Sequence, residues 1–167
     1  RARGSAARFL FTATAEVYGP PLSLPITETH PLNPANPYAI SKTAADQYCA
    51  YLHRAHGMET LRMRPFNHSG PGQAEPFVLS NFARQIAEIE SGRRAPLMRV
   101  GNLSAARDFL HVKDVVRAYE LAALRGRAGE AYNVCSGQSH VIREALTLLL
   151  RMSRKTVVLD EDPARMR

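Results

Sequence analysis

The sequence predicts an α/β fold built on a parallel sheet, because strands and helices alternate along it. The apolar run over residues 9–11 is typical of a short buried strand, and a helix over residues 38–55 follows, with Gly57 at its end. Residues 59–66 then form a second strand. A strand, a helix and a strand in succession are the crossover unit of parallel sheets. We therefore expect the later part of a doubly wound parallel sheet, with a small α/β cap.

The remaining chain continues the same alternation. Helices are expected over residues 77–90, 111–124 and 141–152, and strands over 96–101, 131–134 and 156–159. We place the sheet mainly in residues 1–75 and the cap in residues 76–167, interleaved with returns to the sheet. The predicted inward stripe of the helix over 111–124 is Val112, Val115, Val116, Tyr119 and Ala123. One side of the helix over 38–55 carries Ala44, Ala45, Tyr48, Leu52 and Ala55.

Composition excludes several classes of protein. Among 167 residues, 45% are hydrophobic and 22% charged, as in ordinary globular domains, and no apolar run reaches membrane-spanning length. Cys49 and Cys135 provide no disulfide framework, so we expect reduced thiols in a cytoplasmic protein. His53 and His56 have no third partner nearby in sequence, so no metal site is expected. The net charge of +7 comes without a nucleic-acid motif, and we assign it to a cleft for a diphosphate.

The chemically suggestive stretch begins where the first strand ends. Thr14 and Glu16 follow that strand, and in parallel sheets reactive groups gather beyond the carboxyl ends of strands. Residues 19–37 hold six of the eleven prolines and form a rigid loop. Beyond the loop, Tyr38 and Lys42 are four residues apart on one helix face, about 6 Å along its axis. A nearby ammonium group favours the phenolate form, so Tyr38 becomes a usable acid or base, and Thr14 can hydrogen-bond the same substrate oxygen.

Together these residues resemble the extended short-chain dehydrogenase/reductases, which modify nucleotide sugars. Thr14 before Tyr18-Gly19 matches the family's strand-end motif, and Tyr38 and Lys42 match its Tyr-x-x-x-Lys. The resemblance implies a Rossmann sheet, NAD(P)H as cofactor, Tyr38 as catalytic acid/base, Lys42 on the nicotinamide ribose and Thr14 on the reacting oxygen. It also implies that Pro65, Phe66 and His68 lie near the cofactor.

A narrower resemblance comes from residues 66–73, Phe-Asn-His-Ser-Gly-Pro-Gly-Gln, and from the helix that follows them. These segments look like the bacterial GDP-4-keto-6-deoxy-D-mannose reductases. The resemblance implies a GDP-hexose substrate and a homodimer that pairs through the helix of Tyr38. The residues it implies for nucleotide-sugar binding are Asn67, Val78, Asn81, Arg84, Arg107 and Arg165.

Three functions stay open at this point. Reduction of the 4-keto group of a GDP-6-deoxy-hexulose is the leading hypothesis. By the resemblance, Glu16 matches the glutamate that removes a sugar proton in related dehydratases, so GDP-mannose 4,6-dehydratase, or another nucleotide-sugar epimerase or dehydratase, is the second. The sequence contains no Gly-x-Gly-x-x-Gly turn after a strand, so we expect a fragment that lacks the first strands of the sheet. The resemblance also implies that the chain continues beyond residues 162–167, so we expect a truncated C-terminus. The third hypothesis is therefore an inactive binding or dimerising module, and the choice between NADH and NADPH belongs to the expected missing half.

Overall fold

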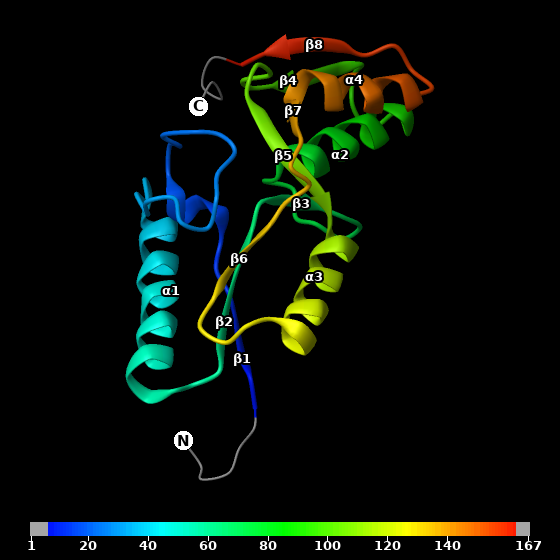
Figure 1. Ribbon diagram of the computed structural model, residues 1–167. Helices are drawn as coiled ribbons and strands as arrows, with labels where there is room; N and C mark the ends of the chain where they lie inside the picture. Colours follow the sequence, from blue (N-terminus) through cyan, green and yellow to red (C-terminus); the bar gives the residue numbers. More distant parts are fainter. Residues whose placement is uncertain (1–6, 163–167) are drawn as a thin grey trace. The chain divides into compact units, whose positions relative to one another are not determined.

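Three parallel strands form the sheet that organises the N-terminal part of the chain. The computed structural model describes residues 7–162, and its elements are shown in Figure 1. Strands β1 (Phe9–Thr12), β2 (Thr60–Pro65) and β6 (Ala131–Val134) lie in the order β1-β2-β6, with both pairs parallel. Helices α1 (Pro37–His56) and α3 (Val112–Arg125) cover opposite faces of this sheet (Figure 1). The predicted parallel α/β architecture is confirmed.

The chain divides into two units that interleave in sequence. The first consists of Arg1–His68 and Leu110–Gly137, and the second of Ser69–Phe109 and Gln138–Arg167. Each unit has its own apolar core. In the first, Met63, Val115, Ala122 and Val134 pack together against the sheet.

Both ends of helix α1 have clear local causes. The Asn36 side chain accepts a hydrogen bond from the Ala39 amide at 2.8 Å, and Pro37 occupies the first turn, where a missing N–H costs nothing. Gly57 ends the helix with φ of 61°, in the left-handed region that favours glycine. The buried face of α1 is centred on Asp46 and Cys49.

In α1, Ala44, Tyr48 and Ala55 are exposed, and the face toward the sheet is centred on Asp46. The predicted inward face of α3 needs correction. In α3, Val116 and Ala123 are exposed, while Val115 and Ala122 are buried. The true stripe of α3 follows Val115, Ala118, Tyr119 and Ala122. The prediction was right for Val115 and Tyr119, left out Ala118 and Ala122, and wrongly included Val116 and Ala123.

The second unit contains a parallel strand pair and two helices. Strands β4 (Leu97–Val100) and β8 (Val158–Glu161) pair, with Leu97 opposite Val158. Helices α2 (Val78–Glu90) and α4 (Ile142–Met152) form its core together with β4 and the segment that follows β4. The buried core residues are Phe82, Ile86, Met98, Val100, Leu103, Ile142 and Leu146. Phe82, Ile86 and Ile89 form the buried apolar face of α2. The last strand begins two residues later than expected, because Val158 rather than Thr156 takes up the pairing with β4.

A third sheet was not foreseen. Strands β3 (Asn67–Ser69), β5 (Ala106–His111) and β7 (Ser139–Val141) lie in the order β3-β5-β7, with β5 and β7 antiparallel. The first three residues of the polar, glycine-rich segment 67–73 form β3. Three-residue strands are too short for a periodic pattern, so only their pairing partners reveal them.

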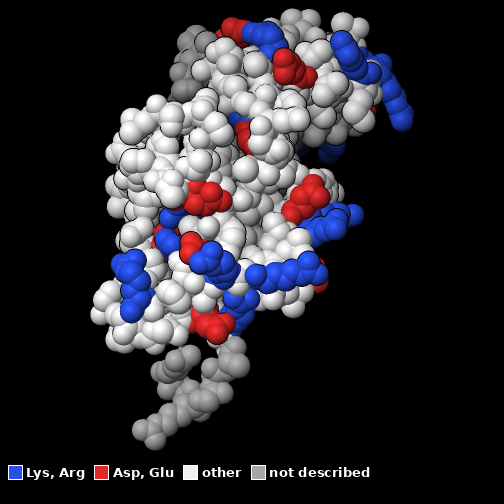
Figure 2. Space-filling model, in the orientation of Figure 1, with Lys and Arg blue, Asp and Glu red and all other residues white. Residues whose placement is uncertain are grey.

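The surface charges are mixed rather than segregated on the face that Figure 2 shows, where blue and red residues lie beside one another in several places. Surface ion pairs such as Arg8–Glu59 and Arg143–Glu161 match this pattern. Among residues 7–162, no helix combines the length and apolar character needed to cross a membrane.

Candidate active site

The carboxyl ends of β1 and β2 place the predicted reactive residues of the first unit at one edge of its sheet. Thr12 lies opposite Met63 in the parallel register, and the Ala13 amide donates to the Met63 carbonyl at 2.8 Å. Thr14 follows β1, and Pro65 is the last residue of β2. This common edge is the expected location of a site in a parallel sheet.

Lys42 is anchored at this edge by the backbone of β1. Its Nζ donates to the Thr12 carbonyl oxygen at 2.9 Å. The same ammonium lies 5.3 Å from the centroid of the Phe11 ring and 5.9 Å from that of Tyr38. The pair predicted from the Tyr-x-x-x-Lys spacing is therefore adjacent in the structure, with the ammonium held in place.

Tyr38 lies in the first turn of α1 and is 51% exposed. Its exposure leaves the phenol accessible to a reactant, whereas its backbone is held by the Asn36 cap and by a hydrogen bond from Ser41 Oγ to its carbonyl oxygen at 2.8 Å. An accessible hydroxyl on a fixed backbone beside an ammonium is the arrangement that proton transfer needs.

Thr14 and Glu16 are held by local hydrogen bonds. Thr14 caps the short 3₁₀ helix η1 (Ala15–Tyr18), and its Oγ1 accepts from the Glu16 amide at 3.2 Å. The Glu16 carboxylate is exposed and accepts from Asn36 Nδ2 at 2.8 Å. Asn36 thus links the strand-end carboxylate to the start of α1, a role that sequence reasoning missed.

The end of β2 continues the same edge. The Phe66 amide donates to the Val134 carbonyl at 2.9 Å, which extends the pairing of β2 with β6. Asn67 and His68 are exposed on β3, and His68 Nδ1 donates to the Phe66 carbonyl oxygen at 2.9 Å. Pro65 is buried, so only its backbone can face a ligand.

Tyr119 of α3 also reaches this edge, although the sequence suggested only a packing role for it. Burial raises the pKa of Tyr119, its hydrogen bond with the Thr12 side chain lowers it, and the nearby Tyr38 raises it again. The net pKa lies above its ordinary value, so Tyr119 stays a neutral phenol. Its place in the helical stripe beside Val115 is the only sequence signal for it.

In the second unit, a cleft of about 410 Å³ contains two of the predicted substrate residues. Asn81 and Arg84 of α2 line it. The other lining residues are Glu75, Gln85, Arg94, Ala95, Leu97 and Arg99. Three guanidinium groups at one cleft favour an anionic ligand.

A buried amide organises this cleft. Gln85 is 2% exposed, and its Nε2 donates to Asn81 Oδ1 at 2.7 Å and to the Arg99 carbonyl at 3.1 Å. Its Oε1 accepts from Arg94 Nη1 and from the Arg99 amide, both at 3.1 Å. Arg84 forms ion pairs with Glu75 and Glu88. The roles of Gln85, Arg94 and Arg99 were not predicted, because only the fold brings α2 beside β4.

The remaining predicted substrate residues lie elsewhere. Val78 packs against the core of the second unit. Arg107 is exposed on β5, opposite His140, and its Nη1 donates to the Ala106 carbonyl at 2.7 Å. Arg165 lies outside the described residues. Within residues 7–162, no cluster of three or more His, Cys, Asp or Glu side chains is arranged to hold a metal ion.

The sheet edge of the first unit fits the reactive end of a nicotinamide cofactor. The exposed phenol of Tyr38 provides a proton donor, the anchored ammonium of Lys42 provides a cation, and β2 ends beside them in the sheet at Pro65. None of the strands β1, β2 and β6 is followed by a Gly-x-Gly-x-x-Gly turn, so the usual pyrophosphate seat is absent from these strand ends.

Comparison with known proteins identifies the family. The sequence model described as GDP-mannose 4,6 dehydratase matches residues 1–165. GDP-6-deoxy-D-mannose reductase of Pseudomonas aeruginosa is 44% identical over 169 aligned residues, which cover 100% of this chain and 56% of the relative. The dTDP-glucose 4,6-dehydratase of Streptomyces griseus is 36% identical over 89% of this chain and 44% of its own length.

Solved structures agree with these matches. The structure of RMD from Pseudomonas aeruginosa complexed with NADPH has a TM-score of 0.88 and 42% identity, over 99% of this chain and 57% of that one. The UDP-glucose 4-epimerase of Thermus thermophilus in complex with NAD has a TM-score of 0.79 and 28% identity, over 95% and 52%. The chain therefore spans about half the length of these relatives. It belongs to the GDP-mannose 4,6-dehydratase family of the extended short-chain dehydrogenase/reductases.

Proposed function

We propose that the protein carrying this chain uses NAD(P)H to reduce the 4-keto group of a GDP-6-deoxy-hexulose. The observation that carries the proposal is Lys42, bonded to the Thr12 carbonyl and adjacent to the exposed Tyr38. The 44% identity to a GDP-6-deoxy-D-mannose reductase over the whole chain supports this substrate class.

In this mechanism the chain supplies placement and a proton. A bound NAD(P)H supplies the hydride that reduces the carbonyl carbon. Tyr38 donates its phenolic proton to the oxygen as negative charge develops there, which completes the alcohol. The Lys42 ammonium stabilises the resulting phenolate and holds the nicotinamide ribose, and the Thr14 hydroxyl steadies the reacting oxygen. Pro65, Phe66 and His68 would flank the nicotinamide.

The proposed nucleotide site lies in the second unit. Asn81, Arg84, Arg94 and Arg99 line its cleft and offer amide and guanidinium donors to a GDP diphosphate and base. Asn67, Val78, Arg107 and Arg165 remain predicted contributors. We also propose that the protein acts in the cytoplasm as a homodimer, with Ala44, Tyr48 and Leu52 of α1 at the interface.

Dehydration of GDP-mannose is a second candidate, because Glu16 is exposed next to Thr14 and could serve as a base. The family model and the 33% identity to the GDP-mannose 4,6-dehydratase of Yersinia enterocolitica support it. In this structure the Glu16 carboxylate is engaged by Asn36, which argues for the reductase as the first candidate.

The test uses the natural gene product that carries this sequence, whatever its length. Given GDP-4-keto-6-deoxy-mannose and NADPH, a reductase consumes one NADPH for each alcohol formed. Tyr38→Phe should lower kcat about 1000-fold, because only the proton donor is removed. Tyr51→Phe is the matched control, since Tyr51 is on the same helix and is 48% exposed.

The alternatives give different results in the same assay. Loss of water from GDP-mannose without net NADPH consumption would establish the dehydratase. Binding of GDP without turnover of either sugar would establish the inactive module. Equal activity in wild type and Tyr38→Phe would overturn the proposed mechanism.

A further inference from the structure

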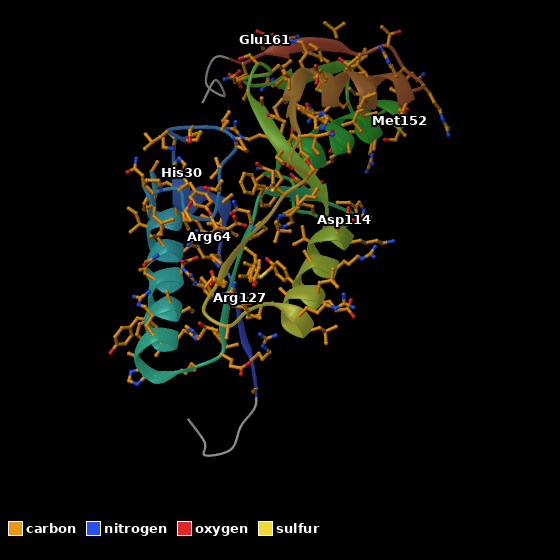
Figure 3. All side chains as sticks on the ribbon, viewed as in Figure 1. His30, Arg64, Asp114, Arg127, Met152 and Glu161 are labelled. Carbon is orange, nitrogen blue, oxygen red and sulfur yellow. The ribbon has the colours of Figure 1, made fainter. Side chains whose placement is uncertain are left out.

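A buried polar cluster lies behind the proposed site in the first unit. It consists of Asp46 of α1, Arg62 and Arg64 of β2, Tyr18 of η1 and Asn133 of β6, and it is called the Asp46 cluster below. Asp46 and Tyr18 are 0% exposed and Arg64 is 2% exposed. Figure 3 labels Arg64 beside α1 and His30 in the loop beyond it.

Asp46 joins helix α1 to strand β2 through three charge-assisted hydrogen bonds. Its Oδ1 accepts from Arg62 Nη1 and Arg64 Nη2, and its Oδ2 accepts from Arg64 Nε, each at 2.9 Å. Arg64 therefore grips the carboxylate with two parallel bonds, the geometry that gives Arg–carboxylate pairs their directional precision. Burial lowers the pKa of Arg64, but its hydrogen bonds to Asp46 and Tyr18 more than compensate, so it stays charged.

Arg64 also extends the cluster to the strand-end turn and the proline loop. Its Nη1 donates to Tyr18 Oη at 2.8 Å and to the Glu28 carbonyl at 3.1 Å. Tyr18 Oη in turn donates to Asn133 Oδ1 at 2.7 Å. Asn133 Nδ2 donates to the Ile26 carbonyl at 2.9 Å. One guanidinium thus connects α1, β2, η1 and the loop.

The elements that meet in this cluster are those that carry the proposed reacting groups. Tyr38, Lys42 and Asp46 recur every four residues along α1, so Asp46 is one turn beyond Lys42. Tyr18 ends the turn that Thr14 begins. A buried ion pair seldom stabilises a fold more than apolar packing of similar volume would, and in some proteins such pairs specify the geometry. The cluster is therefore better suited to alignment than to stability.

We propose that Arg64 and Tyr18 are positioning residues that set Tyr38 and Lys42 relative to Thr14. This inference rests on the proposed function for its kinetic consequence. A hydrogen-bonded connection through Arg64 fixes α1 against η1, and a displacement of about 1 Å at a reacting group can cost on the order of 100-fold in rate.

The experiment compares Arg64→Lys, Tyr18→Phe and the control Arg143→Lys in the natural gene product. Arg64→Lys keeps the charge but loses the paired bonds to Asp46, and Tyr18→Phe removes only the hydroxyl. Arg143 forms an exposed ion pair with Glu161 in the second unit. We expect kcat to fall about 100-fold in Arg64→Lys and about fivefold in Tyr18→Phe. KM for the nucleotide sugar should stay unchanged in all three.

Hydrogen exchange gives a readout that does not require activity. Amides of residues 12–19 and 37–44 should exchange faster in Arg64→Lys and Tyr18→Phe, while those of the second unit do not change. A purely structural role would lower the melting temperature but leave kcat per folded molecule unchanged, and this result would overturn the inference. If the wild type reduces no sugar, the proposed function fails, and exchange in Tyr18→Phe alone still decides whether the cluster aligns the two segments.

Discussion

Two groups of arginines in this chain have opposite surroundings. The side chains of Arg62 and Arg64 are 13% and 3% exposed and share the buried Asp46. Those of Arg94 and Arg99 are 31% and 63% exposed and line the cleft of the second unit. All four contribute equally to the net charge of +7. Arg94 and Arg99 are ion-paired too, with Glu88 and Asp160, so burial rather than charge or pairing separates arginines that hold the fold from arginines that a ligand can reach.

The comparison makes opposite predictions for the two groups. Replacing the buried arginines should change the folding stability and the position of Tyr38 and Lys42 relative to Thr14. It should not change the affinity for the nucleotide sugar. Disturbing the cleft arginines should change ligand binding with little effect on folding. Each variant below tests whether the buried and the cleft arginines differ in this way.

The largest expected effect comes from Asp46→Ala. The variant removes the carboxylate that Arg62 and Arg64 share. Because removal of one partner leaves an uncompensated buried charge, the free energy of unfolding should fall by about 3–5 kcal/mol. Urea unfolding of the two proteins measures the loss. Asp46→Asn keeps a side chain of similar shape with one acceptor oxygen, and its stability should fall between them. A loss no larger than that of a surface pair would mean that the Asp46 cluster is dispensable.

Arg94→Ala should act mainly on binding. Arg94 bonds Gln85 and Glu88 at the cleft, and loss of a charged hydrogen bond to a phosphate weakens binding about tenfold or more. Titration calorimetry with GDP measures this directly. Arg93→Ala is the control, because the Arg93 side chain bonds Ser91 and does not line the cleft. Equal loss of GDP affinity in both variants would remove the cleft from the nucleotide site.

Tyr18→Phe should have a smaller effect on stability that depends on pH. Burial is the main cause that raises the pKa of Tyr18 above its ordinary value of 10.0. The folded state therefore keeps the phenolic proton when the unfolded state has lost it, so this contribution is present below pH 10 and is lost as pH rises further.

The variant should lose about 1 kcal/mol at neutral pH, because one buried hydroxyl leaves its partners. Above pH 10 its stability should fall less steeply than that of the wild type. Urea midpoints measured across the alkaline range test both statements. Parallel pH curves for the two proteins would contradict the assignment of the buried phenol.

The smallest effect is expected for Glu161→Gln. Its partner Arg143 is 56% exposed, and exposed ion pairs contribute less than about 0.5 kcal/mol. Thermal unfolding should show no resolvable change, and added salt should not alter the comparison. A larger loss would show that exposure does not rank ion pairs in this chain.

The pattern of apolar residues along the sequence predicted much of the fold. Apolar runs indicated the short strands β1 and β6, and the longer elements β2, α1 and α2 were also predicted with ends close to those observed. In the two helices the apolar spacing repeats over several turns. Tyr38 and Lys42 became neighbours through helix geometry alone. The strands β3, β5 and β7 had no such repeat and were missed as strands.

The residues of the Asp46 cluster are visible in the sequence, but their pairing cannot be predicted without the tertiary structure. Arg62 and Arg64 alternate on an otherwise buried strand and require an anion, and Asp46 is the one acidic residue in the sequence of α1. That pairing needs α1 and β2 to be packed together first. The same holds for Gln85 with Arg94 and Arg99.

By itself the sequence therefore determined the α/β class, the order of the main elements and the local pair of Tyr38 and Lys42. These properties depend on residues within a few turns of one another, where backbone geometry leaves little choice. Only the tertiary structure decided which buried charges share a partner, where Asn36 meets Glu16 and which arginines line the cleft. Such contacts join residues far apart in the chain, and their energy exists only once packing brings them together.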